Sequence, residues 1–114
     1  MSEATDLVDR QVAAWRDRDL ERFLGFYAPD VKVRDLDGNV LMDGLEAMRG
    51  QYGQLFRDSP ELSGEIPRRM VIGDYVIDEE DISGFILPGF PATLHAVVIY
   101  RVQDGQIREV VLLS

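Results

Sequence analysis

The spacing of apolar residues changes along this chain, and the change limits the fold more than any other feature. Up to about residue 27, and again between residues 45 and 56, apolar side chains recur every three or four residues, which is typical of helices buried on one face. After residue 60 they alternate or run continuously in strand-length segments. The sequence therefore predicts an α+β protein in which helices come before most of the sheet.

Three helices are predicted. Two short amphipathic helices lie in tandem between residues 5 and 27, where Asp19 can cap the second and Pro29 is expected to end it. The third helix begins after Asp43, and Glu46 three residues later completes the pattern of a capping box. These helices are expected to pack together on one face of the sheet.

Strands account for most of the remaining sequence. A short strand pair is expected at residues 31–35 and 40–42. Four longer strands follow, at residues 62–72, 75–85, 94–102 and 106–113. Gly73-Asp74 and Asp104-Gly105 are hairpin signals, so the four long strands are predicted to form an antiparallel meander.

Some strand segments are apolar on both faces. Residues 97–99 and 110–113 consist of Val, Ile and Leu without alternation, so both faces of the sheet need cover. The helices can cover one face, and a second copy of the protein is the simplest cover for the other. Residues 1–114 are thus expected to form one domain that assembles as a homodimer.

Charge and residue usage exclude several classes of function. The chain has 21 Asp and Glu against 12 Lys and Arg, a formal net charge of −9, which disfavours nucleic acids and anionic membranes as partners. With no cysteine and one histidine, thiolate chemistry and multi-histidine metal sites are excluded, and no metal or cofactor is predicted. The N-terminal sequence lacks the pattern of a signal peptide, and no run of about 18 apolar residues occurs. A cytoplasmic protein is expected.

Asp35 is the main candidate for catalysis. Strand alternation places it on the same face as Val31 and Val33, where a carboxylate without a partner costs several kcal/mol. Burial there would raise the pKa of Asp35, as suits a general base acting on a small organic molecule. The alternative is that the strand ends after Val33 and leaves Asp35 in solvent at the start of a loop.

Aromatic residues and the histidine are further candidates. Trp15, Tyr27 and Tyr52 lie on helix faces that turn toward the sheet, where they either fill the core or line a pocket with their hydroxyls toward a ligand. His95 begins a central strand, but both faces of that strand are apolar. Its role is either structural or catalytic, and alternation does not decide which face it occupies.

The acidic run at residues 78–81 is interpreted as a solvated hairpin segment. Successive strand residues point to opposite faces, so these carboxylates do not converge on a cation. Arg68 and Arg69 are expected to meet these acids across the hairpin, at the surface. The sequence contains no glycine-rich phosphate loop and no nucleophile elbow, which leaves nucleotide and acyl-transfer chemistry without support.

Four stretches carry a family resemblance: Trp15 to Asp19, Phe26 to Val31, Asp35 to Gly44, and Asp104 to Ile107. With the order of the predicted elements, they resemble the SnoaL-like and ketosteroid isomerase-like families of the NTF2-like superfamily. The resemblance covers nearly the whole chain. It implies a strongly curved, mainly antiparallel sheet wrapped around three N-terminal helices, a conical pocket, and dimerisation through the outer face of the sheet. Proteins of this kind include isomerases, cyclases, dehydratases and proteins without catalysis.

The resemblance also implies roles for individual residues. In ketosteroid isomerase an aspartate moves a proton while a tyrosine and a protonated aspartic acid stabilise the enolate. The base falls on Asp35, and two supporting tyrosines fall on Tyr27 and Tyr52. The oxyanion tyrosine falls on Gln11 and the protonated acid near Val98, so neither oxyanion donor is retained in its original form.

Two functions from different classes are expected. The first is an isomerase, cyclase or lyase that uses Asp35 as a general base on a small apolar carbonyl compound. In it Gln11 contacts the developing oxygen, Trp15 forms pocket wall, and His95 is a further candidate on the strand of Val98. The second is a non-catalytic ligand-binding or dimeric assembly module on the same fold. Loss of turnover in an Asp35→Asn variant that stays folded would distinguish the first from the second.

Overall fold

The computed structural model describes residues 3–114, which form three helices and six strands. In chain order these are α1 (Glu3–Arg16), α2 (Leu20–Leu24), β1 (Tyr27–Asp35), β2 (Val40–Asp43), α3 (Leu45–Asp58), β3 (Ser63–Ile72), β4 (Tyr75–Ser83), β5 (Leu94–Gln103) and β6 (Gln106–Leu113). The strands form a single sheet in the order β2-β1-β6-β5-β4-β3. The predicted α+β class is confirmed.

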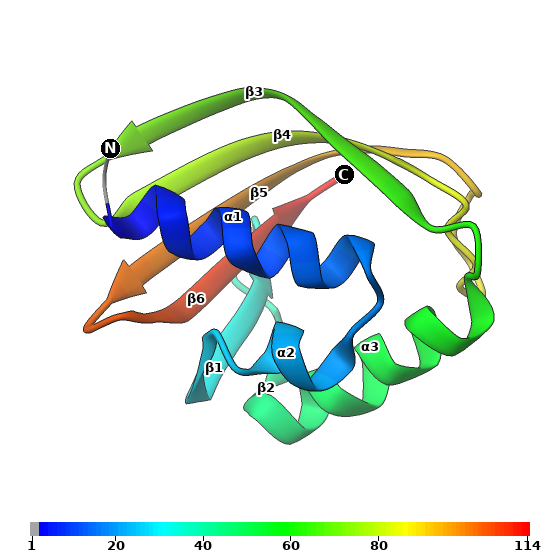
Figure 1. Cartoon of the computed structure of the whole chain (residues 1–114), viewed down its shortest axis with the longest axis horizontal. Coiled ribbons are helices and arrows are strands. Elements are labelled where there is room, and N and C mark those ends of the chain that lie inside the picture. Colours follow the sequence, from blue (N-terminus) through cyan, green and yellow to red (C-terminus); the bar gives the residue numbers. More distant parts are fainter. Residues whose placement is uncertain (1–2) are drawn as a thin grey trace.

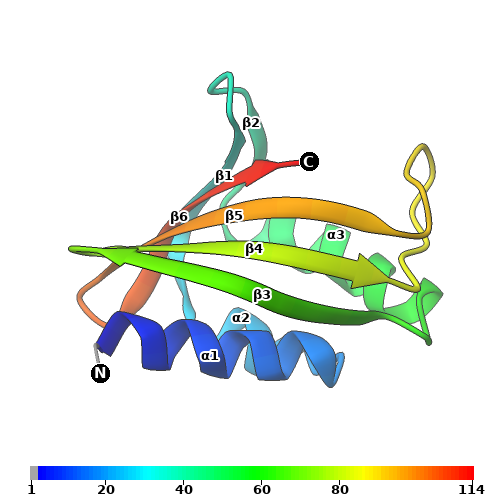
Figure 2. The same cartoon turned by 90° about the horizontal axis from the view of Figure 1, so that it is seen from above.

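The sheet curls around the helices without closing into a barrel. Figure 1 shows β3, β4 and β5 arching over α1, with α2 and α3 below, and Figure 2 shows α1 running alongside β3 on one side of the sheet. All strand pairs are antiparallel except β1 with β6, which is parallel. The curvature leaves a concave face toward the helices and a convex outer face. None of the three helices in the described chain is long and apolar enough to cross a bilayer.

The second helix is shorter than predicted. It begins after the Asp19 cap, whose carboxylate accepts from the Arg22 amide at 3.3 Å, but it ends at Leu24. The chain is already in β1 at Tyr27, so Pro29 lies within a strand and does not terminate a helix. Pro29 fits there because the pairing of β1 with β6 shifts register between Tyr27 and Lys32, where no ladder donor is needed. Pairing with the C-terminal strand thus overrides the local helical pattern.

The predicted capping box at the start of α3 is wrong. Asp43 is the last residue of β2 and its carboxylate lies 2.5 Å from the ammonium of Lys32, its neighbour on β1. Gly44 takes the N-cap position with φ of 89°, a backbone conformation that favours glycine. Glu46 accepts a hydrogen bond from Arg49 instead of capping the helix. Asp43, which the local pattern assigns to the helix cap, therefore belongs to the strand pair.

The core lies between the helices and the concave face. Val76, Val98 and Val110 point inward from β4, β5 and β6 and are almost fully buried. The Asp104-Gly105 turn joins β5 to β6 with positive φ at both residues, 55° and 72°, as the sequence signal predicts. Strand alternation consequently sends the intervening residues of each strand to the convex face.

Candidate functional site

A cavity of about 330 Å³ opens between the helices and the concave face of the sheet. Side chains from α1, α2 and α3 line it on one side and side chains from all six strands line it on the other. Most are aliphatic or aromatic, with a small number of polar groups among them. A concave, mainly apolar cavity of this size is typical of a site for a small molecule.

Aromatic rings form the helical wall of this cavity. Phe23 of α2 lies at the centre, with ring centroids 5.1 Å from Tyr27 and 4.8 Å from Tyr52. Both contacts are tilted, an arrangement that favours ring edges against ring faces. Trp15 of α1 packs against Gly64 so closely that a Cβ on Gly64 would lie 2.9 Å from its ring. These contacts fix the shape of the wall.

A chain of hydrogen bonds crosses the inner end of the cavity. The Tyr27 hydroxyl donates to Gln11 Oε1 at 2.7 Å, and Gln11 Nε2 donates to the Tyr100 hydroxyl at 3.1 Å. Tyr100 in turn is hydrogen-bonded to the side chain of Glu80. Because the Tyr100 oxygen accepts from Gln11, its own proton is directed at Glu80. Gln11 is 2% exposed, so water does not compete for its amide, and the hydrogen bonds within the protein fix which group donates and which accepts.

Glu80 is the acidic group of the inner cavity. It points inward from β4 and its burial raises the pKa of the carboxyl to about 7, with the nearby charge of Asp78 acting in the same direction. The hydrogen bond from Tyr100 and the charges of Arg16 and Arg69 oppose this rise. A carboxyl with such a pKa is present in both protonation states near neutral pH, as proton transfer requires.

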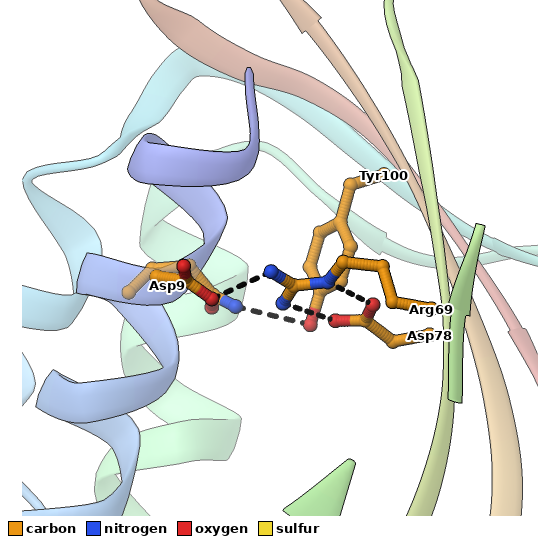
Figure 3. Close-up of polar contacts among 5 residues, drawn as sticks. Asp9, Arg69, Asp78 and Tyr100 are labelled. Carbon is orange, nitrogen blue, oxygen red and sulfur yellow. Dashed lines mark hydrogen bonds and ion pairs between the residues drawn. The ribbon is translucent and has the colours of Figure 1, made fainter. Parts of the chain in front are cut away.

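Asp78 lies two residues before Glu80 on the same face, and it is fully buried. The guanidinium of Arg69 binds it through two contacts, Nε to Oδ1 at 2.6 Å and Nη2 to Oδ2 at 3.0 Å. The remaining Nη1 of Arg69 reaches Asp9 of α1 at 2.6 Å, so that Arg69 joins α1 to the sheet beside Tyr100 (Figure 3). These two carboxylates hold the pKa of Arg69 above its ordinary value.

Tyr52 offers a hydrogen-bond donor to the cavity. No described residue forms a hydrogen bond with its hydroxyl. Every fully buried polar side-chain atom in residues 3–114 has a hydrogen-bond partner, so the Tyr52 hydroxyl, which has none, is not fully buried and is accessible. The residue lines the cavity. Burial of the ring and the charge of Glu80 raise the pKa of Tyr52 above its ordinary value, which keeps the hydroxyl protonated.

The structure brings most of the candidate residues together. Gln11, Trp15, Tyr27, Tyr52 and Val98 all line the cavity. Their contact with a ligand stays a prediction. Tyr27 does so from the start of β1 and not from a helix, because α2 ends before it.

Asp35 is placed elsewhere. It is not among the residues lining the cavity, and its carboxylate accepts from the backbone and side-chain amides of Asn39, each at 2.9 Å. The Asn39 side chain is the main reason that the pKa of Asp35 is lowered, and the expectation that burial would raise it is wrong. Asp35 lies beside Leu112 of β6, which lines the cavity, but the hydrogen bonds from Asn39 hold its carboxylate in the turn that follows β1.

His95 lies on the convex face. Its Nε2 is 2.6 Å from the carboxylate of Glu79, and its side chain is 66% exposed. Val98, three residues later, points inward. The structure therefore shows that the strand face shared by His95, Val97 and Ile99 is the convex one. His95 is thus separated from the cavity described above by the thickness of the sheet.

The interpretation of residues 78–81 as a solvated segment is wrong for half of them. Asp78 and Glu80 face inward, between Val76 and Ile82 on the same face of β4, whereas Glu79 faces outward. Val76 and Ile82 share a face with Asp78 and Glu80, but Ile77 lies on the other face, so alternation alone did not identify the inward set. Tyr100 was missed for a related reason, because its strand is apolar on both sides.

No group of three metal-ligating side chains in residues 3–114 is arranged to hold a metal ion.

Comparison with protein-family descriptions matches residues 8–110 to the SnoaL-like domain. Among curated proteins none matches the sequence significantly.

Solved structures share the fold at low identity. An uncharacterised cystatin-fold protein from Novosphingobium aromaticivorans superposes with a TM-score of 0.87 at 20% identity, over 100% of this chain and 99% of that one. An NTF2-like protein of unknown function from Cytophaga hutchinsonii gives 0.77 at 15% identity, over 96% and 88%. A putative polyketide cyclase from Sinorhizobium meliloti gives 0.74 at 20% identity, over 99% and 100%. These likenesses confirm the predicted NTF2-like fold.

Proposed function

The chain belongs to the SnoaL-like domain family, and from this premise we propose that it binds a small, mainly apolar carbonyl compound and transfers a proton on it. The cavity supplies the binding volume, and Glu80 supplies the group that moves the proton. Glu80 takes the role that the sequence assigned to Asp35. The product of such a step depends on the compound and includes isomerisation, cyclisation and elimination.

The observation that carries this proposal is the position of Glu80 in the cavity wall, with a pKa of about 7. A carboxylate with its ordinary pKa is a weak base, so proton abstraction from carbon by it has little driving force. A group with a pKa near ambient pH both accepts and returns a proton, because each protonation state is populated. Asp35 lacks this property, since hydrogen bonds from Asn39 lower its pKa.

The neighbouring hydroxyls have separate roles in the proposed step. Tyr52 donates to the oxygen on which negative charge develops when a proton leaves the adjacent carbon. Tyr100 keeps Glu80 in place, and Gln11 fixes the orientation of Tyr100 through its amide. One donor in place of two gives weaker oxyanion stabilisation than ketosteroid isomerase has, by about 10²–10³ in rate.

Exchange of carbon-bound hydrogen tests the proposal without knowledge of the natural substrate. A panel of small cyclic and aryl ketones is incubated with the protein in D₂O, and deuterium incorporation next to the carbonyl is followed by NMR. Glu80→Gln is expected to lower the catalysed rate by about 10²–10⁴, the usual contribution of a general base. Asp35→Asn is the matched control, and its rate is expected to stay within a few-fold of the wild-type rate.

The two variants give opposite results under the two assignments. If Asp35→Asn abolishes exchange and Glu80→Gln does not, the base is Asp35 and our assignment of Glu80 is wrong. If no ketone in the panel exchanges faster than in buffer, proton transfer on this class of compound is excluded, and the ligand-binding module remains.

We further propose that the convex face of the sheet forms a homodimer. Met70, Ile77, Ile99 and Val111 are lateral neighbours in one row across β3, β4, β5 and β6. Val76, Val98 and Val110 lie on the buried side, so this row lies on the opposite face, and Met70 is 57% exposed. Exposed apolar rows rimmed by charged ones are typical of contact surfaces. The neighbouring row contains Arg68 and Glu79, which pair with each other at 3.5 Å and form a charged rim beside the apolar row.

Light scattering tests the dimer. The wild-type protein is expected to have twice the chain mass at micromolar concentration, and Ile99→Lys at the centre of the row is expected to give monomers. Arg108→Glu lies on β6 away from this row and is the charge-changing control. A wild-type monomer at that concentration would contradict the proposal, and so would a dimeric Ile99→Lys variant.

A further inference from the structure

The ionisable side chains that line the cavity are all acidic or phenolic. They are Glu80, Tyr27, Tyr52 and Tyr100. Glu65 also borders the cavity, but it is exposed and pairs with Asp81 in the sheet, so its side chain lies on the convex face. No Lys, Arg or His is among the lining residues of the described chain. A ligand with a negative charge meets the carboxyl group of Glu80 and no positive partner in the wall, whereas a ligand with a positive charge meets no repulsive group there.

Glu80 has no basic partner, in contrast to Asp78. Arg69 neutralises Asp78 through two hydrogen bonds, but no side chain in residues 3–114 forms an ion pair with Glu80. Its hydrogen-bond partner is the neutral hydroxyl of Tyr100. A carboxylate in an apolar environment is strongly stabilised by a cation beside it. A positively charged group of a ligand can form an ion pair with Glu80, as Arg69 does with Asp78.

Aromatic rings provide the second element of a cation site. Phe23, Tyr27 and Tyr52 form one cluster with centroid separations of 5.1 and 4.8 Å, and Trp15 lines the same cavity. The faces of Trp and Tyr rings attract ammonium groups, more strongly when water is excluded. Such walls suit quaternary and tertiary ammonium groups, which are large and weakly hydrated.

We propose that the cavity binds small organic cations, that is, quaternary or protonated amines, with the positive group between the Glu80 carboxylate and the aromatic wall. The inference rests on the proposed function in that it uses the same cavity and the same carboxyl. Its consequence is that such cations inhibit proton transfer, because they occupy the same cavity and pair with the carboxylate that would accept the proton. The net charge of −9 of the chain attracts cations toward the mouth in the same sense.

Binding of a cation is coupled to the titration of Glu80. The charged and titratable groups that face Glu80 are Arg16 on α1, Tyr27 on β1, Tyr52 on α3, Arg69 on β3, Asp78 on β4 and Tyr100 on β5. Burial of Glu80 and the charge of Asp78 raise its pKa to about 7, so protons compete with the cation for this carboxylate near neutral pH. Affinity for a permanent cation therefore falls as the pH is lowered through 7, by up to about tenfold for each unit.

A pair of probes of equal shape tests the inference. Choline carries a trimethylammonium group, and 3,3-dimethylbutan-1-ol has a neutral tert-butyl group in the same position. By calorimetry at pH 8, choline is expected to bind at least about tenfold more tightly than the alcohol, a difference within the range of a desolvated cation–π and ion-pair site. Lowering the pH to 5.5 is expected to remove most of this preference in the wild-type protein.

Two variants complete the test. Glu80→Gln is expected to bind choline and the alcohol with similar affinity at every pH, whereas Glu79→Gln, the adjacent residue on the convex face, is expected to keep the wild-type preference. Equal affinity of the wild-type protein for the two probes would overturn the inference, as would a cation preference that survives in Glu80→Gln or an absence of choline binding at millimolar concentration. The wild-type comparison needs no variant, so it stands if Glu80→Gln fails to fold.

This experiment is separable from the test of the proposed function. Choline binding with no ketone exchange would support the cation site and contradict proton transfer. Exchange without choline binding would do the reverse.

Discussion

Asp78 and Glu80 lie on the same face of β4, and the fold places them in opposite chemical situations. Asp78 is fully buried and is neutralised by two hydrogen bonds from Arg69, which also binds Asp9. Glu80 reaches the cavity, has only a hydroxyl as partner, and has a pKa raised to about 7. Burial alone therefore does not make a reactive acid. The partner decides whether a buried carboxyl supports the structure or remains available for chemistry.

Removal of the Asp78 partner should have the largest effect. Arg69→Met leaves a fully buried carboxylate without a counter-charge and is expected to cost about 3–5 kcal/mol of unfolding free energy. Urea denaturation followed by circular dichroism measures this. Arg68→Met is the control, because Arg68 is the preceding residue and its side chain is 86% exposed, and it should change stability by less than about 0.5 kcal/mol. Similar losses in both variants would mean that the Arg69 pair is not a buried structural pair.

Replacing Glu80 with a neutral residue should raise the unfolding free energy at alkaline pH, whereas loss of the Asp78 partner lowers it. The native pKa of Glu80, about 7, lies above the ordinary value of 4.5, so the native state binds more protons than the unfolded state between those pH values. The wild-type protein is thus expected to lose stability as the pH rises through this window, on the order of 2 kcal/mol. Glu80→Gln should be more stable than wild type at pH 8 and indistinguishable at pH 4, as measured by thermal unfolding. A variant less stable than wild type at pH 8 would contradict the raised pKa.

Loss of the Tyr100 hydroxyl should make Glu80 still less acidic. This hydrogen bond lowers the pKa of Glu80, so Tyr100→Phe is expected to raise it above 7, at a stability cost of about 1 kcal/mol. NMR titration of carboxyl carbons in ¹³C-labelled protein measures the shift. Tyr75→Phe removes the hydroxyl of an exposed tyrosine on the convex face and should leave the titration of Glu80 unchanged. An unchanged Glu80 titration in Tyr100→Phe would show that Tyr100 does not hold this carboxyl.

The smallest effect is expected at Asp35, which belongs to neither class. Hydrogen bonds from Asn39 lower its pKa, so the stabilisation they give is present above its ordinary value of 3.8 and is lost as the pH falls through the native pKa. Asp35→Asn should therefore be slightly less stable than the wild-type protein at pH 7 and equally stable at pH 2, as measured by acid and thermal unfolding. A loss comparable to that of Arg69→Met would show that Asp35 is buried in the folded protein.

Local chemistry was sufficient to predict much of the fold. Asp19 caps α2, and Asp104-Gly105 forms the last hairpin, because the backbone groups and φ values involved belong to a few neighbouring residues. The same reasoning failed at Asp43 and Pro29, where strand pairing with distant residues competes with the helical pattern.

The site was only partly predictable. Trp15 and Tyr52 line the cavity as the helical spacing allows, since spacing on a helix fixes which face turns to the sheet. Glu80 and Tyr100 were missed because alternation divides a strand into two sets without saying which one faces inward. On β4 and β5 both sets contain Val or Ile, so hydrophobicity does not break the tie.

By itself the sequence determined the type and order of the elements, the exclusion of thiolate chemistry, and the likeness to SnoaL-like proteins, because these depend on residue types and short-range spacing. The tertiary structure decided which of 21 acidic residues reaches the cavity. Asp35 and Glu80 are both on inward faces of strands. The carboxylate of Asp35 is bound in the turn after β1, whereas the curl of the sheet places Glu80 of β4 in the cavity wall. Which inward-facing carboxylate reaches the cavity is a property of packing that no local pattern contains.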